Sequence, residues 1–144
     1  MARLLIAEDD EFSRDMLRRR LEKAGYETVT ATNGKEAVSV ARESHPDLIL
    51  MDLDMPVMDG RTAIRLLRND PHLFRTPIIV LTAHAEREEV ISALANACNA
   101  YETKPCVLRR LIERIQELLG ETVPGYITPV QSAPEEPSDP ALAP

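Results

Sequence analysis

The chain is poor in aromatic side chains, which make up only 3% of its 144 residues, and it contains no tryptophan. Its core must therefore be aliphatic, built from Leu, Ile, Val, Met and Ala within a hydrophobic fraction of 44%, an ordinary value for a globular protein. So few rings also argue against a protein that stacks the bases of single-stranded nucleic acid on aromatic platforms.

Positive charge is also scarce. The sequence has 17 Lys and Arg against 24 Asp and Glu, which gives a net charge of −7. An acidic chain without a long basic run disfavours nucleic acid and anionic membranes as direct partners.

Cysteines are few, and long apolar runs are absent. Cys98 and Cys106 form no CxxC pair and have no histidine at metal-ligand spacing, so we expect two reduced, partly packed thiols. The apolar run at residues 4–7 is too short for a signal peptide, and none approaches the roughly 20 residues of a membrane span. We therefore expect a cytoplasmic protein.

The last part of the chain differs in composition from the rest. Six of the eleven prolines lie beyond Gly120, together with four acidic residues and no basic ones. Such a segment cannot bury enough apolar surface to order itself. We expect one folded domain over residues 1–120 and a Pro-rich acidic tail, disordered, over residues 121–144.

Short apolar runs alternate with helical patterns along the first 120 residues. Strands are predicted at 4–7, 28–31, 47–51, 78–81 and 100–103, and helices at 12–24, from 33–34 to 45, around Ile64 and Leu67, at 87–97 and at 108–119. This strict alternation predicts an α/β fold with a doubly wound parallel sheet. The strand at 47–51 is apolar on both faces, which indicates helices on both sides of the sheet.

Polar residues gather at the carboxyl ends of the predicted strands, where open parallel sheets bind their ligands. They are Glu8, Asp9, Asp10, Asp52, Asp54, Thr82 and Lys104. So many carboxylates at one edge need a cation or shared protons, and a small set of hard oxygen ligands favours Mg²⁺. A Mg²⁺ beside a carboxylate and a lysine is typical of phosphoryl transfer.

Four segments in this order and spacing resemble the receiver domains of response regulators, the CheY-like family of two-component signalling. They are the acidic pair Glu8-Asp9, the stretch 46–60 (PDLILMDLDMPVMDG), Thr82-Ala83, and residues 101–105 (YETKP). The resemblance runs from about Arg3 to Leu119. It implies a flavodoxin-like fold, a five-stranded parallel sheet with strand order 2-1-3-4-5.

The resemblance also implies roles for individual residues. Asp52 would be the phosphoacceptor, and Lys104 would contact the phosphoryl oxygens. Glu8, Asp9 and Asp52, together with the backbone carbonyl of Asp54, would surround the Mg²⁺.

A further group of residues would form the switch. Thr82 would move towards the phosphoryl group, and Tyr101 would then turn inward. The Lys104–Pro105 bond would be cis. We add the hypothesis that Asp54 and His84 lie within reach of each other and modulate dephosphorylation.

The function implied by this resemblance is a phosphorylation-activated response regulator. A histidine kinase or phosphotransfer protein would donate the phosphoryl group from a phosphohistidine, with Mg²⁺ as cofactor and Mn²⁺ able to substitute. The chain would signal by binding a downstream protein, as a monomer or a phosphorylation-dependent dimer. It would not be an enzyme beyond self-catalysed phosphoryl acceptance and slow autodephosphorylation.

The sequence departs from the family pattern at three positions. Cys106 stands where Phe is common, Glu102 where an apolar residue is usual, and Asn96 where Gly often ends a helix. We expect Glu102 to make the outer edge of the fifth strand more polar.

Two other functions remain open on the sequence. Asp52-Leu53-Asp54 after an apolar strand also resembles the nucleophile motif of Mg²⁺-dependent phosphatases of the haloacid dehalogenase type, although no acidic pair follows Lys104 as that family requires. The other is a pseudo-receiver, an interaction module that never takes up phosphate.

Overall fold

The computed structural model describes residues 1–83 and 97–120, in which strands and helices alternate as predicted. The elements are β1 (Arg3–Ala7), α1 (Glu11–Lys23), β2 (Glu27–Ala31), α2 (Gly34–Ser44), β3 (Leu48–Asp52), α3 (Gly60–Arg68), β4 (Ile78–Thr82), β5 (Ala100–Thr103) and α5 (Leu108–Leu119). The helix predicted at 87–97 (except for Ala97) and the tail at 121–144 lie outside the described residues.

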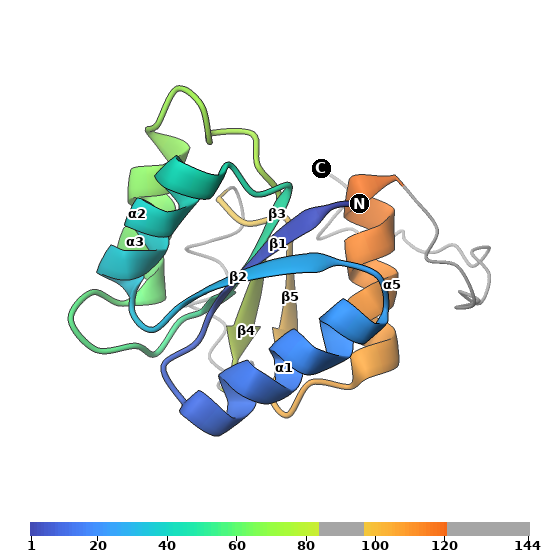
Figure 1. Ribbon diagram of the computed structural model, residues 1–144. Helices are drawn as coiled ribbons and strands as arrows, with labels where there is room; N and C mark the ends of the chain where they lie inside the picture. The colour runs from blue at the N-terminus through green and yellow to red at the C-terminus, as the bar shows by residue number, and fades with distance from the viewer. Residues whose placement is uncertain (84–96, 121–144) are drawn as a thin grey trace, which may run out of the picture.

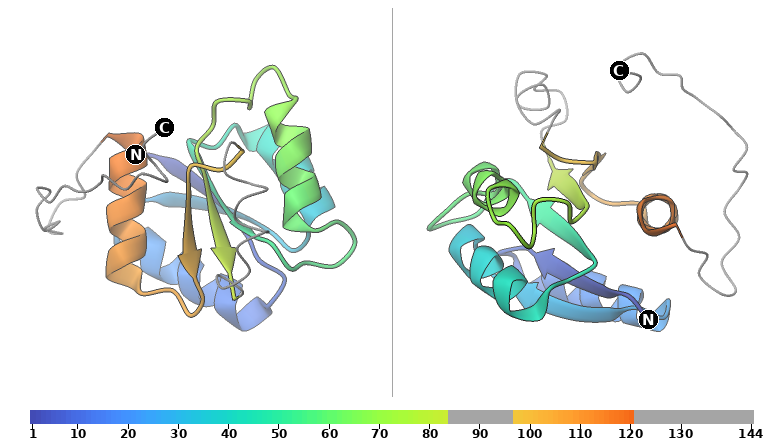
Figure 2. Two further views of the ribbon diagram at one scale, coloured as in Figure 1. Left: turned by 180° about the vertical axis from the view of Figure 1, so that it is seen from behind. Right: turned by 90° about the horizontal axis from the view of Figure 1, so that it is seen from above.

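The five strands form one sheet in the order β2-β1-β3-β4-β5, and every neighbouring pair is parallel. This confirms the predicted doubly wound, flavodoxin-like architecture. Helices α2 and α3 cover one face of the sheet, and α1 and α5 cover the other (Figures 1 and 2). Because all strands run the same way, their carboxyl ends meet at one edge, next to the start of α1 (Figure 1).

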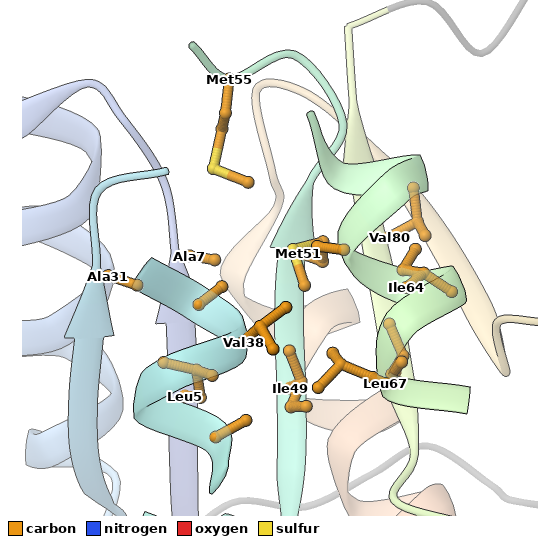
Figure 3. Packing of buried hydrophobic residues seen from close by; sticks show 14 of the residues in the cluster. Leu5, Ala7, Ala31, Val38, Ile49, Met51, Met55, Ile64, Leu67 and Val80 are labelled. Carbon is orange, nitrogen blue, oxygen red and sulfur yellow. The ribbon is translucent and has the colours of Figure 1, made fainter. Parts of the chain in front are cut away.

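Two aliphatic clusters separate the sheet from its helices, as the scarcity of aromatic residues predicts. Side chains of alternate strand residues, such as Leu5, Ile49 and Val80, pack against α2 and α3 in the cluster shown in Figure 3. The opposite residues, such as Leu4 and Leu50, pack against α1 and α5. All five residues of β3 and of β4 are buried, which explains why these strands are apolar on both faces.

Three helices begin at a residue whose side chain accepts a hydrogen bond from the first turn. The capping residues are Asp10 for α1, Asn33 for α2 and Asp59 for α3, and their partners are the backbone amides of Ser13, Glu36 and Thr62. Such caps satisfy amides that have no partner within the helix. They fix where each helix leaves the carboxyl edge of the sheet. Within the described residues, no helix is long and apolar enough to cross a membrane.

Candidate functional site

Asp52 is the last residue of β3 and is only 2% exposed. The strand continues pairing with β4 beyond it, since the amide of Leu53 donates to the carbonyl of Leu81 at 3.2 Å. On the other side, α3 begins directly against the strand end, and a Cβ at Gly60 would collide with the carbonyl of Asp52. Glycine at position 60 is therefore required for the loop that presents Asp52.

A second close approach holds the loop between β3 and α3. The amide of Gly34, at the start of α2, donates to the carbonyl of Met58 at 2.9 Å. A Cβ at Gly34 would collide with that same carbonyl. Val57, the residue before Met58, adopts a positive φ of 68°, which is costly for a β-branched side chain. The loop beside Asp52 is thus held in one conformation by backbone contacts from two helices.

Glu8 follows β1 and is completely buried. Its amide donates to the carbonyl of Ala31 at 3.0 Å, which extends the β1–β2 pairing by one residue. Its Oε2 accepts a hydrogen bond from the amide of Asp10 at 3.1 Å. Asp10, which the sequence placed at the same edge, instead turns its carboxylate to the amide of Ser13 and caps α1.

Three carboxylates remain close together at the edge of the sheet. One oxygen each from Glu8, Asp9 and Asp52 lies within 4.8 Å of the others. Oε1 of Glu8 is buried and receives no well-directed hydrogen bond within the described residues. A buried carboxylate oxygen of this kind suits a hard divalent cation such as Mg²⁺, and the exposed Asp9 leaves room for the waters that Mg²⁺ retains. The side chains present therefore fit a magnesium site.

Lys104 follows β5 and reaches across the edge to two of these carboxylates. Its Nζ lies 2.8 Å from Oε1 of Glu8 as an ion pair, and it donates a hydrogen bond of 3.2 Å to Oδ2 of Asp52. Its backbone amide donates to the carbonyl of Thr82 at 2.8 Å, and the Lys104–Pro105 peptide bond is cis. Burial lowers the pKa of Lys104, but the two carboxylates more than offset this, so its pKa lies above the ordinary value.

The electrostatics of the site act on Asp52 in the opposite sense. Burial, followed by the negative charge of Glu8, raises the pKa of Asp52 to about 6, although Lys104 and the amide of Asp54 oppose the rise. Crowded carboxylates raise one another's pKa because they cannot all be charged without a compensating cation. A bound cation would therefore favour the charged form of Asp52 over its protonated form.

Of the remaining predicted site residues, the structure describes three. Thr82 ends β4 and is only 1% exposed, and Asp54 is exposed on the loop after Asp52. Tyr101 in β5 is 42% exposed. His84 lies outside the described residues, so its predicted proximity to Asp54 stays a prediction.

The expectation for Glu102 was wrong. Its side chain is buried, at 5% exposure, on the face of β5 that packs against α5, and it does not make the outer edge of the strand more polar. Its Oε2 accepts a hydrogen bond of 2.9 Å from Nε of Arg114, and Arg110 lies 3.8 Å from its Oε1. Two arginines one helical turn apart on α5 can therefore neutralise a carboxylate that the strand turns inward.

Sequence reasoning also missed Arg14 of α1. Its guanidinium Nη1 donates to the carbonyl of Glu8 at 2.9 Å and lies 3.4 Å from the carbonyl of Asp9. The pattern of charges on α1 gives no sign of this, because a helical arginine beside other arginines resembles a solvated face. Its proximity to the acidic pair becomes visible only when the turn between β1 and α1 is known.

Comparison with known proteins places this geometry in a family. The family model described as "Response regulator receiver domain" matches residues 4–116. The polar-differentiation response regulator DivK of Brucella ovis is 38% identical over 118 residues, which cover 82% of this chain and 96% of that protein.

Solved structures show the same similarity. The receiver domain of a sensor histidine kinase from Pseudomonas aeruginosa, solved with a magnesium ion in its active-site cleft, is 32% identical, with a TM-score of 0.78 over 83% of this chain and 98% of that one. The response regulator TrrA of Thermotoga maritima, solved with Mg²⁺ and BeF, is 30% identical, with a TM-score of 0.74 over 83% of this chain and all of that one. The chain therefore belongs to the family of response regulator receiver domains, the phosphorylation-dependent signalling modules of two-component systems.

Proposed function

We propose that this receiver domain accepts a phosphoryl group on Asp52, in a Mg²⁺-dependent reaction, from a phosphohistidine of a histidine kinase or phosphotransfer protein. The observation that carries the proposal is the position of the buried Asp52 between two further carboxylates and the ammonium of Lys104. Because the chain belongs to the receiver family, the receiver function is preferred to the dehalogenase-type phosphatase considered from the sequence.

The residues of this chain divide the chemistry among them. A carboxylate oxygen of Asp52 attacks the phosphorus in line, the bond from phosphorus to the imidazole nitrogen breaks, and the nitrogen keeps the electron pair. Lys104, 3.2 Å from Oδ2 of Asp52, then pairs with a phosphoryl oxygen. Glu8, Asp9, Asp52 and the carbonyl of Asp54 would hold the ion. Bound Mg²⁺, or Mn²⁺ in its place, supplies positive charge opposite the phosphoryl oxygens.

The switch follows from the new charge. A phosphoryl group adds negative charge and strong acceptors at a site where Lys104 and the hydroxyl of Thr82 can respond. If Thr82 moves towards it, the exposed Tyr101 of β5, which pairs with Val80 two residues before Thr82, gains space to turn inward. The surface near β5 would then change, and a downstream protein would read it, with the domain as a monomer or a phosphorylation-dependent dimer. Loss of the phosphoryl group would be slow and modulated by Asp54 and His84.

The proposal is tested by incubating the protein with acetyl phosphate and counting phosphoryl groups by intact-mass measurement. Wild type should gain one group in Mg²⁺ and none in EDTA, whereas Asp52→Asn should gain none. Asp54→Asn, a neighbouring carboxylate on the same loop, serves as the matched control and should still be labelled. If wild type stays unlabelled in Mg²⁺, the domain is a pseudo-receiver.

The downstream partner is approached with the beryllofluoride-bound protein, which mimics the phosphorylated state. The proposal expects a protein that is retained by this form and not by Asp52→Asn treated in the same way. Equal retention by both forms would contradict phosphorylation-dependent signalling.

A further inference from the structure

We propose that Arg14 is a positioning residue for the magnesium site. It acts through hydrogen bonds to the backbone carbonyls of the acidic pair rather than through its charge. This inference rests on the function proposed above. Arg14 is not itself a ligand of the proposed site. Its guanidinium contacts two consecutive carbonyls, those of Glu8 and Asp9, through one nitrogen, at 2.9 and 3.4 Å.

The turn between β1 and α1 needs such a donor. Glu8 is the last residue whose amide joins the β1–β2 pairing, through the carbonyl of Ala31. The carbonyl of Glu8 meets Arg14 in a half-buried setting, where a carbonyl without a donor is costly, whereas the longer contact to the carbonyl of Asp9 is exposed. Arg14, one turn into α1 and half-buried, supplies that donor from the helix that the same turn leads into.

The two carboxylates of the pair are held very differently. Glu8 is anchored through its own side chain, since its Oε2 accepts from the amide of Asp10 and its Oε1 pairs with Lys104. Asp9 is exposed, and within residues 1–83 and 97–120 no hydrogen bond to its carboxylate is found. The direction in which the Cα–Cβ bond of Asp9 leaves the backbone is set by the two peptide planes on either side of it, whose carbonyls are the ones that Arg14 contacts.

The charge of Arg14 and its hydrogen bonds to the two carbonyls should have opposite effects on Mg²⁺ affinity. A positive charge close to the site repels Mg²⁺, so removing it should strengthen binding if charge alone mattered. Hydrogen bonds that orient Asp9 lower the entropic cost of ordering this ligand, so removing these hydrogen bonds should weaken Mg²⁺ binding. Groups that orient metal ligands typically change affinity by about 10- to 100-fold when mutated. The sign of the change in Mg²⁺ affinity thus separates the two roles.

The test is calorimetric titration of Mg²⁺ into wild type, Arg14→Gln, Arg14→Lys and Arg18→Gln. Arg18 is the matched control, because it lies one turn further along α1 and pairs with Asp15 and Glu22, not with the acidic turn. Arg14→Gln should raise the dissociation constant roughly 3- to 30-fold. Arg14→Lys keeps the charge and a single donor nitrogen, so its dissociation constant should lie between those of Arg14→Gln and wild type. Arg18→Gln should bind Mg²⁺ as tightly as wild type or slightly more tightly.

A second readout separates positioning from general loss of stability. The rate of labelling by acetyl phosphate, measured against Mg²⁺ concentration, should reach the wild-type maximum in Arg14→Gln, with only its half-saturating Mg²⁺ concentration increased. An unchanged or tighter Mg²⁺ affinity in Arg14→Gln would overturn the inference, as would a fall equal to that of Arg18→Gln. Asp9→Asn provides the reference for loss of a ligand: if it and wild type bind Mg²⁺ equally, the proposed metal site itself fails, independently of Arg14.

Discussion

The ammonium of Lys104 and the carboxylate of Asp52 meet at 3.2 Å, although one follows β5, the other ends β3, and β4 lies between the two strands. The same ammonium approaches Glu8 at 2.8 Å. One lysine thus balances two buried carboxylates. This arrangement makes the stability of the domain depend on the balance of charge at the site.

Replacing Lys104 with methionine should destabilise the metal-free protein and make it depend on Mg²⁺. Two buried carboxylates would lose their cation, and removing one partner of a buried pair costs about 3–5 kcal/mol, which we reduce to about 1–3 kcal/mol because Lys104 is 27% exposed. Urea unfolding with and without Mg²⁺ measures this. The rise in stability on adding Mg²⁺ should be larger in the variant than in wild type.

Lys35→Met is the control for this experiment, because Lys35 is exposed on α2 and its loss changes the net charge equally. We expect it to unfold within about 0.5 kcal/mol of wild type, with or without Mg²⁺. If both variants respond alike, the effect of position 104 is only one of net charge.

Asp52→Asn should stabilise the metal-free protein at neutral pH. The pKa of Asp52 is raised from 3.8 to about 6 in the folded state, chiefly by burial and then by Glu8, so folding favours its protonated form. The stability that this proton provides is present below about pH 4 and is lost as the pH rises towards 6. An amide needs no proton, so the variant should gain about 1–3 kcal/mol over wild type at pH 7.

This gain should vanish near pH 4, where wild type holds the proton, and should reverse in saturating Mg²⁺, which only wild type binds fully. Urea unfolding at the two pH values, with and without Mg²⁺, gives all four differences. A variant less stable than wild type at pH 7 in EDTA would show that the crowding of carboxylates is not destabilising.

Loss of Arg114 and loss of Glu102 should change the free energy of unfolding by unequal amounts. Arg114→Ala leaves a carboxylate of 5% exposure with only the more distant Arg110, and should cost about 1–3 kcal/mol. Glu102→Leu leaves two arginines that are already 43% and 59% exposed and can turn to water. It should be close to neutral, because a leucine suits the apolar contact with α5.

Unfolding of these two variants by urea, with Arg109→Ala as an exposed control on the same helix, measures the inequality. Equal losses from both sides of the pair would mean that Glu102 is less buried in solution than in this structure.

The sequence predicted the sheet, its direction and the edge that carries the site, because these depend on alternation and on where apolar runs stop. Strand β5 and helix α5 begin and end at the predicted residues, and Asp52, Glu8 and Lys104 meet as expected. What failed was the direction of individual side chains. Asp10 shares its residue type with Asp9, and only the geometry of the α1 start assigns one to capping and leaves the other in the cluster.

Glu102 was misjudged for a related reason. In a strand of four residues, alternation fixes that Tyr101 and Glu102 face opposite sides, but not which side is covered. A charged residue is expected to face water, and this expectation fails when a neighbouring helix brings arginines to it. Arg14 was missed because its partners are backbone carbonyls, which no sequence pattern distinguishes.

Formation of an acyl phosphate on Asp52 is tested by locating the modified residue. Protein treated with acetyl phosphate is reduced with borohydride, which converts an aspartyl phosphate into homoserine, and the peptides are sequenced by mass spectrometry. Homoserine is expected at position 52 in Mg²⁺, with none in EDTA and none at Asp9 or Asp54. Homoserine at another aspartate, or at none despite bound Mg²⁺, would contradict phosphorylation of Asp52.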